Sequence, residues 1–348
     1  MSKSNRRLVR TLFQVEVISL LTINILAGTR FFRTKISPEE QEATASILKT
    51  EKNRIELAIN AHDGMQLSTA MFTMDNPTAI VQILHGATEH KELYYNFAHF
   101  LNENGYAVII SDLRGHGETV NRSYPYGHMN SVDEMIDDVY RVTQYAKEIY
   151  PDKPLYIVGH SLGSILARCY LQKHDNEVDK LVMTGTTRSI DKTKLGLFIG
   201  NWATFYSGAY NHSKILHLIG GSTIYKASSF EANMVTTDRD LYEIMSADPL
   251  MHFSWTNNGA LTMFEAASDL KQYKKYNVQN PKLEILSLSG TKDPVTGGDM
   301  GLKDTEQTLR KIGYSRISIK QYEEKLHSVL FETNRDTVYQ DVLDFLKK

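Results

Sequence analysis

Three residues of this sequence have the types needed for nucleophilic catalysis, namely Ser161, Asp293 and His327. A serine hydroxyl is a weak nucleophile at neutral pH, so it needs a base in contact with it and a third group that orients the base. His327 would accept the proton of Ser161, and Asp293 would hold the other ring nitrogen and stabilise the imidazolium. The sequence therefore predicts acyl transfer through a serine, provided that the fold brings the three side chains together.

Ser161 lies at the centre of Gly-His-Ser-Leu-Gly, residues 159–163. An apolar run at residues 155–158 precedes this motif, and apolar residues at helical spacing follow it up to residue 173. This pattern is typical of a nucleophile elbow, a strand-to-helix turn so tight that its central residue is forced outward. The two glycines leave room for the backbone to fold back. Ser161 would then stand at a helix N-terminus, where free N–H groups favour developing negative charge.

Asp293 and His327 each follow a predicted strand in the last third of the chain. Asp293 comes in the turn after residues 283–290, and His327 follows residues 317–322, which alternate as an edge strand does. The chain order Ser, Asp, His is the one used by sheets that carry a nucleophile elbow. Asp299 and Asp304 lie farther along, past the turn, so Asp293 is the preferred third member.

The remaining elements predict where these residues meet. Strands alternate with helices, and the strands are continuous in apolar residues, which indicates a parallel sheet covered on both faces. Polar segments end three further strands: His85-Gly86-Ala87 after 79–84, Asp112 to Gly117 after 106–111, and Thr184 to Thr187 after 180–184. Because ligands bind at the carboxyl ends of such strands, these loops should converge on Ser161. The backbone N–H groups of Ala87 and Leu162 are the expected oxyanion donors.

The domain organisation follows from the same alternation. We predict an α/β fold with a mostly parallel, eight-stranded-type sheet whose core comprises residues 54–187 and 277–348. Residues 62–64, His-Asp-Gly, are expected to join two strands as a hairpin. Residues 188–276 break the alternation with helical, aromatic-rich sequence, so we predict a helical lid there. Residues 36–53 are polar and are interpreted as a connector, with the folded domain beginning near Lys52.

The first 35 residues have the character of a membrane-associated segment. Cations flank an apolar stretch from Leu12 to Gly28, which polar residues including Glu16 interrupt. A membrane-spanning helix needs about 20 mostly apolar residues, so a signal anchor, a cleaved signal peptide and an interfacial helix all remain open. The alternative is a helix packed on the domain of a cytoplasmic protein.

Composition excludes several other classes of function. The formal net charge of the 348 residues is −2, and no long block of like charge occurs, which argues against a nucleic-acid partner. No phosphate-binding or dinucleotide-binding glycine motif occurs, and His85, Glu89 and His90 miss an inverted zinc motif by one residue, so we expect neither cofactor nor metal. Cys169 is the single cysteine, and the oligomeric state is left open.

Several motifs together resemble the monoacylglycerol lipase and lysophospholipase branch of the α/β-hydrolases. They are His85-Gly86-Ala87-Thr88-Glu89-His90, Asn96-Phe97-Ala98, Asn104-Gly105-Tyr106-Ala107-Val108, Asp112-Leu113-Arg114-Gly115-His116-Gly117, the elbow motif, Ser289-Gly290 to Asp293-Pro294-Val295, and Leu326-His327. The resemblance covers about residues 54–348 apart from the lid. It departs at Leu93-Tyr94, where the family usually has Arg-Tyr, and at Ser164, where a second glycine is frequent.

The resemblance implies hydrolysis of an ester in a lipid with one fatty-acyl chain. Combined with the residues above, it favours a serine esterase acting on monoacylglycerol or lysophospholipid through an acyl-enzyme intermediate. A short-chain carboxylesterase or a serine peptidase with the same triad is the alternative within enzymes. A non-catalytic, hydrolase-like membrane scaffold is the alternative from another class.

Overall fold

A single nine-stranded sheet forms the centre of the protein, in a computed structural model that describes residues 44–186, 193–214, 216 and 230–348. The strands lie in the order β1-β2-β3-β5-β4-β6-β7-β8-β9. Their bounds are β1 Ala45–Thr50, β2 Arg54–Asn60, β3 Gln66–Phe72, β4 Ala79–Leu84, β5 Tyr106–Ser111, β6 Leu155–His160, β7 Lys180–Thr184, β8 Glu284–Gly290 and β9 Arg316–Tyr322. The sheet confirms the predicted α/β class.

The sheet combines an antiparallel edge with a parallel body. The pairs β1–β2, β2–β3 and β3–β5 are antiparallel, and every pair from β5–β4 to β8–β9 is parallel. All residues of β4, β5, β6 and β7 are buried, as strands covered on both faces require. β9 lies at the edge, as its sequence predicts, but its exposure does not alternate, because Ser318, Ile319 and Lys320 are all exposed.

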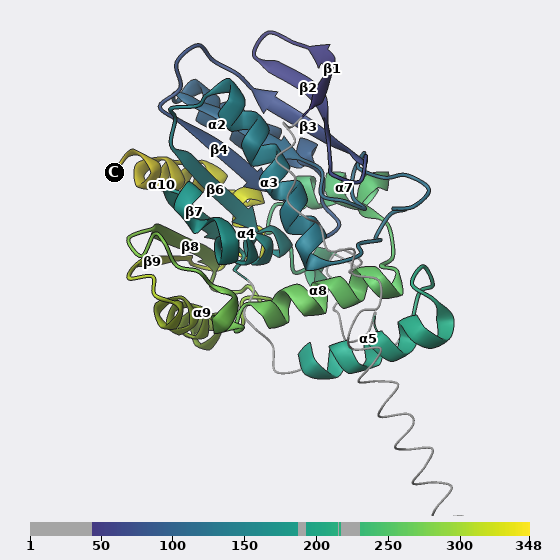
Figure 1. Ribbon diagram of the computed structural model, residues 1–348. Coiled ribbons are helices and arrows are strands. Elements are labelled where there is room, and N and C mark those ends of the chain that lie inside the picture. The colour runs from purple at the N-terminus through teal and green to yellow at the C-terminus, as the bar shows by residue number, and fades with distance from the viewer. Residues whose placement is uncertain (1–43, 187–192, 215, 217–229) are drawn as a thin grey trace, which may run out of the picture.

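Helices cover both faces of the sheet (Figure 1). Their bounds are α2 Tyr95–Glu103, α3 Val132–Ile149, α4 Leu162–His174, α5 Thr193–Ser207, α7 Arg239–Ala247, α8 Asn257–Asp269, α9 Gly298–Ile312 and α10 Arg335–Lys347. Apolar side chains of α3, α4, α8 and α9 share one core cluster, whereas those of α2 and α10 belong to a second. The nucleophile helix α4 therefore lies between the sheet and further helices, which fixes its position.

The helices of the predicted lid are stacked against the core. α8 packs directly on α4, where Cys169 Sγ lies 3.6 Å from the carbonyl oxygen of Ala266. α5 lies across α8 on the side away from the sheet (Figure 1). Gly200 lies at this crossing, where an added Cβ would come within 2.9 Å of Leu261 Cδ1 at the end of that flexible side chain. Within the described part of residues 188–276 the regular structure is helical and no strand occurs, as predicted. We call residues 193–276 the cap.

The prediction of a connector over residues 36–53 is wrong for its second half. Residues Ala45–Thr50 form β1, which pairs antiparallel with β2 and adds a ninth strand to the sheet. Five of its six residues are exposed. Because neither face of this strand is buried, its sequence does not show the alternation of apolar and polar residues that indicates a strand. The remainder of the connector, up to residue 43, lies outside the described residues, as does the segment 1–35. Among the described helices, none has the length and apolar character needed to cross a membrane.

Candidate active site

Ser161 occupies the turn between β6 and α4 in the conformation that its motif predicts. Its φ of 49° and ψ of −113° are unfavourable for a residue with a side chain, and such strain is typical of a nucleophile elbow. A Cβ at Gly159 would lie 2.5 Å from the carbonyl oxygen of Gly163, and one at Gly163 would lie 2.0 Å from that of Leu84. Both positions therefore require glycine, and together they hold α4 against the end of β4.

His327 connects the two other predicted residues by hydrogen bonds. Its Nε2 lies 2.8 Å from Ser161 Oγ, and its Nδ1 lies 2.9 Å from Asp293 Oδ2. All three side chains are buried, with Ser161 the most exposed at 7%. Gly290, at the end of β8, lets the two loops meet, since a Cβ there would lie 2.0 Å from the carbonyl oxygen of Lys325. The fold thus brings Ser161, His327 and Asp293 into one hydrogen-bonded series.

The carboxylate of Asp293 is surrounded by hydrogen-bond donors. Its Oδ1 accepts from the backbone N–H groups of Val295 at 2.8 Å and Thr296 at 3.2 Å, and its Oδ2 accepts from the Thr296 hydroxyl. Burial opposes ionisation of this carboxyl, but His327 and these donors outweigh it and lower the pKa of Asp293 to about 2. Asp293 is therefore ionised over the physiological pH range and can stabilise a charged imidazole.

The loop after β4, which carries Ala87, is held by the buried carboxylate of Glu89. Glu89 Oε2 accepts hydrogen bonds from the backbone N–H of Gly86 at 2.6 Å and from the Tyr94 hydroxyl at 2.5 Å. Leu162 is the first residue of α4, so its N–H group belongs to the unpaired first turn of that helix. The close approach of Gly163 to the end of β4 brings this helix start beside the Ala87 loop.

His160 is a buried neighbour of the site that the sequence did not single out. Its Nδ1 lies 3.0 Å from Thr184 Oγ1, and its Nε2 lies 3.2 Å from Ser328 Oγ and 3.5 Å from Glu89 Oε1. Burial lowers the pKa of His160 to about 4, so the ring is neutral at pH 7. Its position next to Ser161 in the elbow motif was the sequence feature that could have indicated a role at the site. It ties the nucleophile turn to the loops of Glu89 and His327.

Asp112, directly after β5, also holds the segment that follows Ala87 in place. Asp112 accepts a hydrogen bond from the backbone N–H of Lys91 at 2.7 Å and forms an ion pair with the Lys91 ammonium at 3.1 Å. Both side chains are almost fully buried. Because Lys91 lies in the segment that continues from Ala87, this pair fixes that segment to the end of β5.

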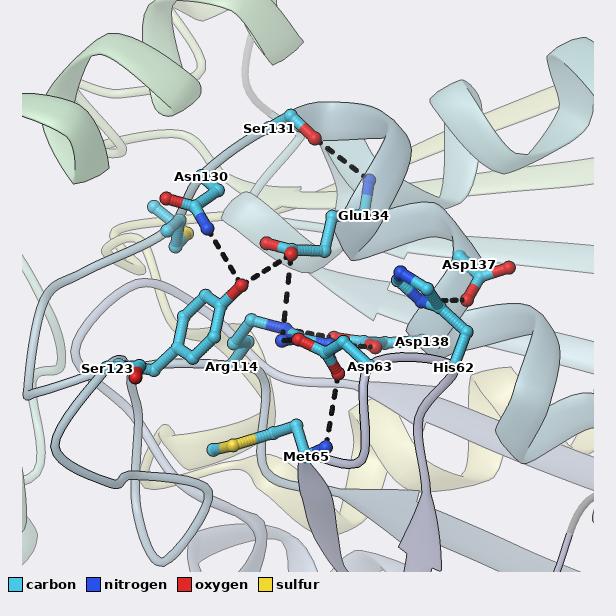
Figure 2. A network of polar contacts seen from close by, with 12 residues as sticks. His62, Asp63, Met65, Arg114, Ser123, Asn130, Ser131, Glu134, Asp137 and Asp138 are labelled. Carbon is cyan, nitrogen blue, oxygen red and sulfur yellow. Dashed lines mark hydrogen bonds and ion pairs between the residues drawn. The ribbon is translucent and has the colours of Figure 1, made fainter. Parts of the chain in front are cut away.

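Arg114 forms a second buried network, drawn in Figure 2. Its guanidinium makes two hydrogen bonds to Asp138, at 2.8 and 2.7 Å, and two to Asp63, at 2.6 and 3.3 Å, while Glu134 lies 3.7 Å away. Burial opposes the charge of Arg114, but these carboxylates more than offset it and raise its pKa. The network joins the β2–β3 turn, the loop after β5 and α3, and none of its hydrogen bonds reaches Ser161 or His327.

Comparison with known proteins identifies the family of the chain. Residues 75–334 match the family described as serine aminopeptidase, S33. The chain is 21% identical over 287 residues to a monoacylglycerol lipase of Mycolicibacterium smegmatis, which covers 81% of this chain and 93% of that protein. It is 24% identical to lysophospholipase L2 of Escherichia coli over 193 residues, 55% of this chain and 56% of that one.

Solved structures show the same fold. A thermostable carboxyl esterase from Bacillus coagulans superimposes with a TM-score of 0.76 at 22% identity, covering 85% of this chain and 99% of the esterase. A monoacylglycerol lipase of Paleococcus ferrophilus gives a TM-score of 0.61 at 19% identity, covering 81% and 98%. The chain belongs to the S33 serine aminopeptidase family of α/β-hydrolases, as the resemblance of its motifs predicted.

Proposed function

We propose that this chain is a serine esterase that cleaves monoacylglycerols or lysophospholipids through an acyl-enzyme intermediate. The observation that carries the proposal is the series of hydrogen bonds from Asp293 through His327 to Ser161, at 2.9 and 2.8 Å. These are the contacts that a serine needs to act as a nucleophile. The names of the relatives, a monoacylglycerol lipase and a lysophospholipase, support a lipid substrate with one acyl chain.

In the proposed reaction, Ser161 Oγ attacks the ester carbonyl carbon while His327 Nε2 accepts the hydroxyl proton. The backbone N–H groups of Ala87 and Leu162 donate hydrogen bonds to the resulting oxyanion. Asp293 stays ionised and stabilises the imidazolium. His327 then protonates the leaving alcohol, and in the second half it activates a water molecule that releases the fatty acid from Ser161.

The cap is the part of the chain proposed to accommodate the acyl chain. A long acyl chain needs apolar surface, and the cap carries both tryptophans of the protein together with many other aromatic residues. We further propose that residues 1–35, outside the described part, associate the enzyme with a membrane where such lipids reside. A cytoplasmic enzyme without this association is the alternative.

The decisive measurement is kcat/KM for glycerol monoesters of increasing acyl length, with Ser161→Ala as the matched inactive variant. Each buried CH₂ contributes about 0.8 kcal/mol, which corresponds to about a fourfold rise in kcat/KM per CH₂ if the cap provides an apolar channel. We expect a steep rise towards long chains that disappears in Ser161→Ala.

Other outcomes would change the proposal in defined ways. A flat or falling series would indicate a short-chain carboxylesterase. Faster cleavage of aminoacyl amides than of any ester would indicate a peptidase, as the name of the S33 family suggests. If the wild-type protein hydrolyses no ester or amide and a fluorophosphonate leaves Ser161 unlabelled, the proposed function is wrong, and the non-catalytic scaffold becomes the better interpretation.

A further inference from the structure

The backbone of the loop that carries His327 forms hydrogen bonds with the backbone of the cap. The N–H of His327 donates to the carbonyl oxygen of Met234 at 3.1 Å, and the N–H of Ser328 donates to that of Val235 at 2.8 Å. The Thr236 hydroxyl donates to the carbonyl oxygen of Phe331 at 2.6 Å. Residues 234–237 of the cap thus run alongside the histidine loop, although about 90 residues separate the two segments in sequence.

Glu332 joins the same two segments through its side chain, which is fully buried. Its Oε1 accepts a hydrogen bond from the N–H of Leu326 at 2.8 Å. Its Oε2 accepts from the N–H of Thr237 at 3.0 Å and from the Thr237 hydroxyl. A carboxylate is the group suited to this place, because it accepts several hydrogen bonds and its charge strengthens them.

We infer that Glu332 is a positioning residue that sets the place of His327 relative to Ser161, an inference that rests on the proposed function. Leu326 immediately precedes His327, so the Oε1 hydrogen bond fixes the backbone from which the imidazole projects. The Oε2 hydrogen bonds attach that backbone to the cap. Glu332 therefore makes the cap part of the support for the general base, although it makes no hydrogen bond to any member of the triad.

Two substitutions of Glu332 separate its contributions. Glu332→Gln keeps the length and one acceptor oxygen, but it sets an NH₂ group against a donor on one side of the bridge. It also removes the negative charge that faces the Lys325 ammonium at 3.8 Å. Glu332→Asp keeps the charge but shortens the side chain by one CH₂, so it cannot reach both N–H groups. The matched control is Glu324→Gln, because Glu324 is exposed. Among the ion pairs of the described residues, its carboxylate has one partner, the exposed Lys292 at 3.5 Å.

The experiment counts active sites by fluorophosphonate titration and measures kcat, KM and the labelling rate constant per site for a monoacyl ester. A displaced base slows every step that needs proton transfer, so kcat and the labelling rate constant should fall together in both Glu332 variants, by about tenfold, with KM changed less than about twofold. Glu324→Gln should match the wild type.

A purely structural role for Glu332 would give a different result. The thermal midpoint would fall while kcat and the labelling rate constant per titrated site stayed at the wild-type values, and the inference would be overturned.

If the Glu332 variants do not fold, Thr237→Val tests the same bridge by removing one donor to Oε2. A smaller fall of both constants in Thr237→Val supports the inference, and unchanged constants overturn it. Failure of the proposed function is distinguishable, because it would be seen in the wild type.

Discussion

Two buried aspartates of this protein, each hydrogen-bonded to a nitrogen base, have opposite electrostatic properties. The pKa of Asp293, beside His327, is lowered to about 2. Burial raises the pKa of Asp138, beside Arg114, to about 6, and the guanidinium only partly opposes this. Both residues are at most 5% exposed, so the extent of burial does not explain the difference.

The neighbours of each carboxylate explain it. Asp293 receives hydrogen bonds from a hydroxyl and two backbone N–H groups besides His327. Asp138 shares one guanidinium with Asp63 and Glu134, and both of these raise its pKa further. An excess of donors favours the ionised carboxyl, and an excess of carboxylates disfavours it. The first arrangement suits a catalytic group, and the second holds three segments together at an electrostatic cost.

The largest effect is expected from Asp293→Asn, which should lower kcat by about 10⁴, as the equivalent change does in serine proteases. The amide N–H of Asn would favour the tautomer in which His327 Nε2 carries a proton, so that nitrogen could not accept one from Ser161. Steady-state kinetics with a soluble ester measures the change, with Asp299→Asn on the exposed start of α9 as the control. A variant with more than a tenth of the wild-type kcat would contradict the role given to Asp293.

Arg114→Met is expected to lower stability rather than rate, and by a smaller free energy than the loss of rate in Asp293→Asn. Removing the guanidinium leaves Asp138 and Asp63 without their counter-ion, which should lower the free energy of unfolding by about 3–5 kcal/mol. Urea denaturation at pH 7 measures this, and Arg310→Met, which breaks an exposed pair on α9, should cost less than about 1 kcal/mol. Because the network lies apart from Ser161, kcat per titrated site should stay within about threefold. A tenfold loss of kcat per site would show that the two regions are coupled.

The smallest effect is a pH dependence of opposite sign for the two aspartates. Asp293 binds its proton more weakly in the folded state, so its contribution to stability is present above about pH 4 and is lost as the pH falls towards about 2. Asp138 binds its proton more tightly in the folded state, so its contribution is present below about pH 4 and is lost as the pH rises through about 6.

Urea denaturation of the wild type and of Asp138→Asn between pH 4 and pH 7 isolates the Asp138 contribution, because the difference between the two proteins removes the shared titration of the other groups. Relative to Asp138→Asn, the wild type should lose stability as the pH rises, by no more than about 1.4 kcal/mol per pH unit, the limit for one proton. Glu134→Gln should reduce this slope, since it removes a neighbouring negative charge. Parallel curves for the wild type and Asp138→Asn would show that the pKa of Asp138 is not raised.

The sequence predicted the parts of the fold whose signal is local. The strand before Ser161, β6, and its neighbours in the sheet are rich in apolar residues. The elbow motif constrains its own backbone through Gly159 and Gly163. Asp293 and His327 followed from chain order once the parallel sheet was recognised. The structure brings these three side chains within hydrogen-bonding distance, and their catalytic roles remain the proposal made above.

The remaining features depend on contacts between distant segments, which leave no periodic pattern. Glu332 could not be found because its partner Thr237 lies 95 positions away. Glu89 suggested only an incomplete zinc motif, whereas in the structure its carboxylate holds the backbone of Gly86. β1 was missed because Ile47 and Leu48, its largest apolar residues, are both exposed, at 63% and 65%.

The strand β1 has a practical consequence for producing the protein in parts. A fragment beginning at residue 52 would lose β1 and leave β2, a regular strand whose Leu57 and Ile59 are buried, as the edge of the sheet. An uncovered regular edge invites pairing between copies and aggregation, whereas β1 ends the sheet with a register shift beside Lys49, two features that discourage such pairing. A fragment beginning at residue 44 keeps that protection, and its yield of monomer should exceed that of the shorter fragment.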